Sequence, residues 1–104
     1  MKIVFPVMAN ISLNSRVHWS VKSKRAREQR QIVGWILKGR QRPEPPFVIR
    51  LTRVGPKRMD DDNAIGSLKA CRDAIAEWIG IDDGILTWAY SQRTGPYMVE
   101  MEIE

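Results

Sequence analysis

The sequence lacks the features of a disulfide-stapled or membrane-embedded protein. Its single cysteine, Cys71, cannot form a disulfide within the chain. No apolar run approaches the roughly 20 residues that a membrane-spanning helix needs. At the start of the chain, Lys2 is followed only by a short apolar run that ends at Pro6, unlike a secretory signal. We therefore expect a cytoplasmic protein with no membrane segment.

Acidic residues are scarce in the first 59 residues, where only Glu28 and Glu44 accompany 14 of the 17 lysines and arginines. This part carries a formal net charge of +12, whereas the rest of the chain carries −7. A basic segment of this density suits a polyanion, because each phosphate that it neutralises releases condensed counterions. The charge distribution therefore predicts a nucleic-acid-binding surface in the first part of the chain.

The length of 104 residues predicts one domain spanning residues 1–104, because two shorter pieces could not each bury a core. The composition, 43% hydrophobic and 28% charged, is typical of a globular protein. A core of this size stabilises a fold only modestly, so a dimer would be favourable.

Hydrophobic periodicity predicts six elements in the order β-α-β-α-β-β. The expected segments are strands at 2–9, 47–55, 85–95 and 97–104, and helices at 17–37 and 63–79. This order predicts an α+β fold with a mixed sheet and two main helices. Because the last two strands are joined by Thr-Gly-Pro, we expect them to form an antiparallel hairpin. A glycine, Gly80, is expected to end the second helix.

Several basic residues lie in or near the first turns of the first helix, where positive charge opposes the helix dipole. Helix stability therefore does not explain them. Such residues can be a solvated face, but their number favours a phosphate-binding surface. The candidate nucleic-acid contacts are Arg16, Lys22, Lys24, Arg25, Arg27, Arg53, Lys57 and Arg58.

Three consecutive aspartates precede the second helix. In an extended segment Asp60 and Asp62 would project to the same side, where the two carboxylates could share one Mg²⁺ or Mn²⁺ ion. The ion would offset the repulsion among the three charges. Alternatively, Asp62 or Asn63 caps the helix and the other carboxylates are solvated.

A second acidic pair, Asp82 and Asp83, follows Gly80, near the negative end of the helix dipole. The pair can instead form an ordinary Asp-Gly turn. Lys69 lies seven residues after Asp62, so it could share that residue's helical face and hold a phosphate. It could also form an i,i+4 ion pair with Asp73.

The combined pattern "DDDN…LKACRDAI…GIDDG" resembles that of the RusA-type Holliday-junction resolvases. The resemblance is carried by Asp60, Asp62 and Asn63, then by Lys69 with Ala70 and Asp73, and finally by Asp82 and Asp83. It implies a homodimer that uses Mg²⁺ to hydrolyse phosphodiesters symmetrically at a four-way DNA junction. It also implies that Asp60, Asp62 and Asp83 are the catalytic, metal-binding carboxylates and that Lys69 is the essential cationic residue, which would stabilise the charge that develops on the phosphate. The alternative is a nucleic-acid-binding module of the same fold without catalysis.

A continuous helix from Asp62 to Gly80 would span roughly 27 Å, because each residue adds 1.5 Å. Asp83 would then not easily reach Asp60 and Asp62 of its own chain. We therefore expect that two such helices pack antiparallel in a dimer, which would place the start of one beside the end of the other.

Overall fold

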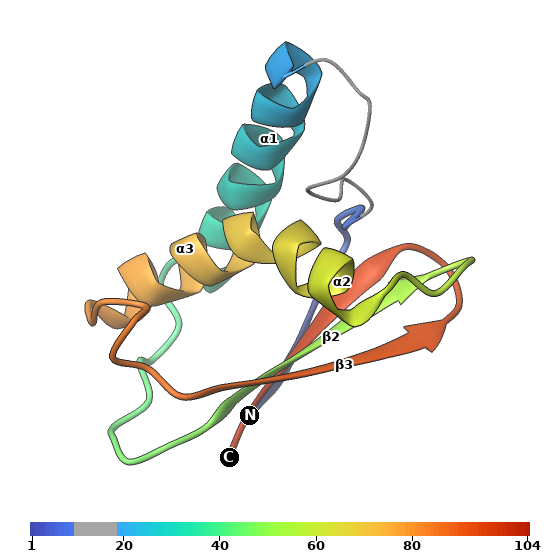
Figure 1. The fold of residues 1–104 in the computed structure, drawn as a ribbon. Coiled ribbons are helices and arrows are strands. Elements are labelled where there is room, and N and C mark those ends of the chain that lie inside the picture. Colours follow the sequence, from blue (N-terminus) through green and yellow to red (C-terminus); the bar gives the residue numbers. More distant parts are fainter. Residues whose placement is uncertain (10–18) are drawn as a thin grey trace.

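Seven elements follow one another in the computed structural model, which describes residues 1–9 and 19–104 (Figure 1). They are β1 (Lys2–Phe5), α1 (Trp19–Leu37), β2 (Ile49–Gly55), α2 (Asp61–Ser67), α3 (Lys69–Ile79), β3 (Trp88–Thr94) and β4 (Met98–Ile103). The predicted α+β class with a mixed sheet is confirmed.

The four strands form one sheet in the order β1-β4-β2-β3. β2 pairs parallel with β3 and antiparallel with β4, and β1 pairs antiparallel with β4. The expected hairpin between the last two strands is wrong, because β2 lies between them. The short connection from Thr94 to Met98 passes the end of β2, where the Gly95 N–H donates to the carbonyl oxygen of Gly55 at 3.0 Å.

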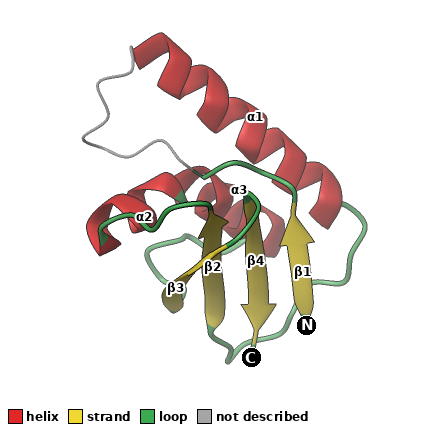
Figure 2. Cartoon of the chain, turned by 90° about the vertical axis from the view of Figure 1, so that its right-hand side faces the viewer, coloured by secondary structure: helices red, strands yellow, loops and turns green. Residues whose placement is uncertain are grey.

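α1 and α3 cover one face of the sheet (Figure 2), and the core lies between the two layers. Alternation along β2 turns Ile49 and Leu51 into this core, where both are fully buried, while Arg50 is exposed on the other face. From the helical layer, Val33 of α1 and Ile75 of α3 are also fully buried. Burial of these apolar side chains holds the helices on the sheet.

The helix predicted at 63–79 is divided into α2 and α3 at Leu68. Leu68 has φ −96° and ψ 0°, and its N–H donates to the carbonyl oxygen of Ile65 at 3.1 Å, one residue closer than in a regular α-helix. Gly66 weakens the helix just before this break, and the side chain of Leu68 is buried in the core. The expected stop is confirmed, since Gly80 is left-handed with φ 82° and caps α3.

The two halves of α1 differ in their surroundings. Its buried residues are Gln29, Val33 and Leu37, all in the second part of the helix. Residues 19–28 are exposed except for the half-buried Lys22. In Figure 1 this first part of α1 extends away from the sheet, so its basic residues are available to a partner.

Candidate nucleic-acid and metal sites

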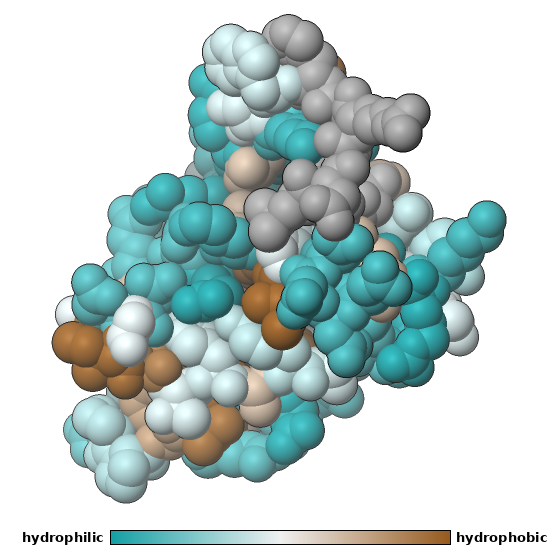
Figure 3. Space-filling view, viewed as in Figure 1, coloured by the Kyte–Doolittle hydropathy of each residue, from teal (hydrophilic) through white to brown (hydrophobic). Residues whose placement is uncertain are grey.

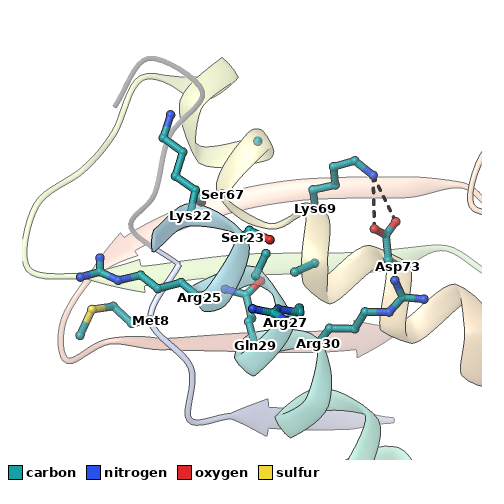
Figure 4. A pocket seen from close by; sticks show the side chains of 13 residues that line it. Met8, Lys22, Ser23, Arg25, Arg27, Gln29, Arg30, Ser67, Lys69 and Asp73 are labelled. Carbon is teal, nitrogen blue, oxygen red and sulfur yellow. Dashed lines mark hydrogen bonds and ion pairs between the residues drawn. The ribbon is translucent and has the colours of Figure 1, made fainter. Parts of the chain in front are cut away.

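A cleft of about 420 Å³ lies between the first part of α1 and the junction of α2 with α3 (Figure 4). Small side chains, among them Ala26 and Ala70, leave the space open. Charged residues line it from both sides: Lys22, Arg25, Arg27 and Arg30 from α1, and Lys69 and Asp73 from α3. Five of these six charged residues are cations.

Two of the five cations have acidic partners. Lys69 Nζ lies 3.2 Å from Asp73 Oδ2, which confirms the ion pair that was one of two interpretations of Lys69. Arg30 Nη2 lies 2.7 Å from Glu77 Oε2, and this hydrogen bond, together with the charges of Glu77 and Asp73, raises the pKa of Arg30 despite partial desolvation. No ion pair involves the other three cations within residues 1–9 and 19–104. The cleft is therefore strongly positive.

The predicted nucleic-acid contacts that are exposed lie in two regions, one on α1 and one between β2 and α2. Lys22, Arg25 and Arg27 line the cleft, and Lys24 is exposed on the same helix. Lys57 and Arg58 are exposed between β2 and α2. The prediction for Arg16 lies outside the described residues. Arg30 belongs to the same basic helix, and it also lines the cleft although it was not among the candidate contacts.

The prediction that Arg53 contacts nucleic acid is wrong, because its side chain is buried. Its Nε donates to the Ala9 carbonyl at 2.6 Å and its Nη1 to the Lys57 carbonyl at 2.8 Å. Burial lowers the pKa of this guanidinium. Gly55 leaves it room, since a Cβ at that residue would lie 2.8 Å from Nη2. Arg53 instead ties the segment after β1 to the loop after β2.

The three consecutive aspartates lie at the start of α2. Asp60 occupies the N-cap position without a side-chain capping bond, and Asp61 is the first helical residue. The extended backbone assumed for this segment is therefore wrong, because Asp62 is already within the helix. All three side chains are exposed, and none forms an ion pair within the described ranges.

Gln92 of β3, which the sequence analysis missed, anchors the segment before these aspartates. Its Nε2 donates to the Met59 carbonyl at 2.7 Å, and its Oε1 accepts from the Met59 N–H at 3.0 Å. Arg58 and Asp61 line a second groove with this part of β3, over the edge of the sheet. No local pattern could have identified the role of Gln92, since Gln92 and Met59 are 33 positions apart in the chain.

Asp83 lies in the loop after α3 and is held by neighbours of its own chain. Its Oδ2 lies 3.2 Å from Arg72 Nη2, and its carbonyl accepts from Trp88 Nε1 at 2.9 Å. The guanidinium of Arg72 stacks over the Trp88 ring, 5.2 Å from the centroid. Asp82, by contrast, belongs to a turn, because its Oδ1 accepts a hydrogen bond from the Gly84 N–H at 2.8 Å. An Asp-Gly turn was one of the two interpretations of the acidic residues Asp82 and Asp83.

The described part of one chain contains no group of three or more His, Cys, Asp or Glu side chains that could hold a metal ion. Asp60, Asp62 and Asp83 are thus not assembled in a single subunit, and Lys69 faces the cleft rather than a carboxylate cluster. Within the described ranges Asp60 and Asp62 form no competing ion pair, and Mg²⁺ is commonly held by one or two carboxylates with substrate phosphates. Each carboxylate therefore suits such an ion, although the start of the helix does not turn the two to the same side.

Comparisons with known proteins add one relative. The chain is similar to an uncharacterized protein of Xylella fastidiosa (strain Temecula1), with 34% identity over 84 residues, which cover 71% of this chain and 54% of that protein. The chain therefore spans about half the length of this relative. No protein-family model matches the chain, and no solved structure matches it.

Two further observations describe the helices and the surface. Among the described helices, none is long and apolar enough to cross a bilayer. On the face in Figure 3, hydrophilic side chains predominate and the hydrophobic patches are small and separate.

Proposed function

We propose that this protein is a Mg²⁺-dependent endonuclease of branched DNA, acting in the cytoplasm as a homodimer on structures such as four-way junctions. The resemblance of the acidic motifs suggests the activity, and the positive cleft supplies a place for the phosphate backbone. The substrate polyanion would be attracted to the cations on α1 and to Lys57 and Arg58 before α2.

The observation that carries the catalytic part is the group of three adjacent, exposed aspartates at Asp60–Asp62, which form no ion pair with any residue that the structure describes. Three like charges at one helix start repel one another, and one carboxylate would suffice for a cap. A hard divalent cation removes this repulsion and binds phosphate oxygens as well.

Each residue then has a specific role. Asp60 and Asp62 hold the cation, and Gln92 fixes the backbone that precedes them through its two bonds to Met59. When bound, Mg²⁺ supplies charge neutralisation at the phosphate and a bound water of lowered pKa. Arg58, beside the aspartates in the chain, orients the scissile phosphate. Asp83 of the partner subunit completes the ligand set if it exchanges Arg72 for the cation.

A nucleic-acid-binding module without catalysis is the second candidate. It is favoured by the ion pairs that occupy two of the residues implied in catalysis, Asp83 with Arg72 and Lys69 with Asp73. In this case the cleft binds the nucleic acid and the aspartates only favour the start of α2 through its dipole.

The test uses a labelled synthetic four-way junction, incubated with the full chain with and without Mg²⁺. We expect cleavage only with Mg²⁺, and we expect Asp62→Asn to abolish it while junction binding persists or tightens. Glu44→Gln is the matched control, since Glu44 is exposed and lines neither groove.

Binding without cleavage in Mg²⁺ or Mn²⁺ would favour the module over the enzyme. Absence of binding to any nucleic acid at moderate salt would overturn both candidates.

A further inference from the structure

The cleft between α1 and the α2–α3 junction has five cations and a single anion, Asp73, among its lining residues. Asp73 interacts with two of the cations: it pairs with Lys69 and raises the pKa of Arg30, although Glu77 is the larger cause of the latter shift. Figure 4 shows Lys69 and Asp73 side by side at one wall of the cleft. This carboxylate therefore competes with any anion that enters the cleft for contact with Lys69 and Arg30.

The shape of the cleft limits what can occupy it. Ser23 and Ala26 of α1 face Gly66 and Ala70 across the gap, and these small residues leave a hollow of about 420 Å³. This volume is near the lower end of the range for small-molecule pockets. A hollow of this volume is too small to enclose a duplex, whose major groove alone is about 12 Å wide, but it can hold part of one sugar-phosphate strand.

Trp19 lies at the start of α1, and its side chain is 73% exposed. It is three residues before Lys22 and four before Ser23, both of which line the cleft, so it shares their helical face. Proteins that bind unpaired strands combine a positive groove with aromatic rings on which bases stack. Trp19 is not among the described residues that line the cleft, but its spacing from Lys22 and Ser23 puts it on the side of α1 that faces the cleft, where its ring can meet a base of the bound strand.

We propose that the cleft binds the backbone of one unpaired nucleic-acid strand, that Trp19 stacks on one of its bases, and that Asp73 weakens the binding by engaging Lys69. This inference deepens the proposed function, on which it rests for the nature of the ligand. It assigns Lys69 to strand binding, whereas the resemblance implies a catalytic role.

The first experiment measures binding of a labelled single-stranded DNA to the full chain by fluorescence anisotropy at several salt concentrations, without divalent ions. We expect Lys69→Ala and Arg27→Ala each to reduce the salt slope by about 0.7, the value for one phosphate contact on a single strand. Lys38→Ala removes an exposed cation outside the cleft and should leave the slope unchanged.

The same assay tests Asp73 by removal of its charge. We expect Asp73→Asn to tighten binding by about two- to fivefold, the size expected when an exposed ion pair no longer competes. Glu44→Gln changes the net charge equally but lies outside the cleft, and it should have a smaller effect. Equal effects of the two variants would show that only net charge matters and would overturn the role of Asp73.

A third pair of variants tests stacking. Trp19→Ala should weaken single-strand binding by about tenfold. Trp35→Ala is the control, because Trp35 is 69% exposed on the same helix but lies near its other end, away from Lys22 and Ser23. Circular dichroism of each variant verifies folding, which is expected because the substituted side chains are exposed or half-buried.

Two results would overturn the inference: unchanged single-strand binding in the cleft variants, or equal losses for a blunt duplex without unpaired bases. If Asp62-dependent cleavage persisted in either case, the proposed function would stand without this inference. If the cleft variants behaved as expected but no DNA were cut in Mg²⁺ or Mn²⁺, the strand site would stand and the nuclease would not.

Discussion

Arg72 Nη2 lies 3.2 Å from Asp83 Oδ2, and this ion pair holds Asp83 beside the aromatic side chains of β3. The two side chains are 24% and 37% exposed, so solvent screens the pair only in part. Asp83 is therefore a structural partner of Arg72, and the proposed role as a metal ligand would require it to leave this pair.

Substitution of Asp83 distinguishes these roles. We expect Asp83→Asn to abolish Mg²⁺-dependent junction cleavage, while loss of the screened pair lowers the free energy of unfolding by only about 1 kcal/mol or less. Asp82→Asn is the matched control, because an asparagine oxygen can still accept the Gly84 N–H bond. Cleavage assays and urea unfolding provide the two measurements. Full activity of Asp83→Asn would leave Asp83 with the structural role alone.

Arg53 is expected to matter for stability and not for nucleic-acid binding. Arg53→Ala would leave the Ala9 and Lys57 carbonyls without their donors, at a cost of about 2–4 kcal/mol in the free energy of unfolding. Arg50→Ala should cost about 0.5 kcal/mol or less, since Arg50 is exposed on the other face of the same strand. Urea denaturation measures both changes. Similar values for the two variants would contradict the buried role of Arg53.

Cys71 is predicted to be unreactive in the folded protein. It is fully buried on α3, its Sγ donates to Gln29 Oε1 at 3.3 Å, and burial raises the pKa of the thiol to about 12. Because the thiolate is the reactive form, we expect labelling by a thiol reagent at pH 8 to be at least on the order of a hundredfold slower than in urea-unfolded protein. Rapid labelling without denaturant would show that α1 opens from α3.

Glu100 gives a pH-dependent contribution to stability. Burial raises the pKa of its carboxyl, but the hydrogen bond from Arg93 and the charges of Arg93 and Lys2 outweigh this effect, so the pKa is lowered overall. A lowered folded-state pKa stabilises the protein above the unfolded value of about 4.3, and this contribution is lost as pH falls through the folded value.

The measurement compares urea unfolding of the wild type and Glu100→Gln between pH 7 and pH 2.5. We expect Glu100→Gln to be less stable by about 1 kcal/mol at pH 7, with the difference fading below about pH 4. Glu102→Gln on the same strand is the control, because Glu102 forms no ion pair in the described part of the chain. A difference that persisted at pH 2.5 would indicate lost packing and not lost charge.

Local patterns predicted the elements but not all of their connections. The alternation through Ile49 and Leu51 placed β2 correctly, and the same alternation puts Arg53 on the buried face, a consequence that charge counting overlooked. The hairpin prediction failed because the short Thr-Gly-Pro connection also permits β4 to cross the end of β2. Neither the break at Leu68 nor the parallel pairing of β2 with β3 has a local signal strong enough to predict it.

For the candidate site, the sequence indicated the cations of α1 and the aspartates of α2 but not their neighbours. The role of Gln92 depends on a contact across 33 residues, and the pair between Arg72 and Asp83 depends on how the loop after α3 folds back. The catalytic interpretation of Asp60, Asp62, Asp83 and Lys69, with Mg²⁺ and a partner subunit, stays a prediction.

By itself, the sequence determined the α+β class, the left-handed stop at Gly80 and the strongly basic character of the first part of the chain, whereas it placed the start of the second helix two residues too late. These features depend on residues near one another in the chain, through hydrophobic periodicity, capping and local charge. Only the tertiary structure decided that Arg53 is buried, that Lys69 joins the cations of α1, and that Asp83 pairs with Arg72. Those relationships arise from packing of distant segments on one sheet, where the core determines which side chains meet.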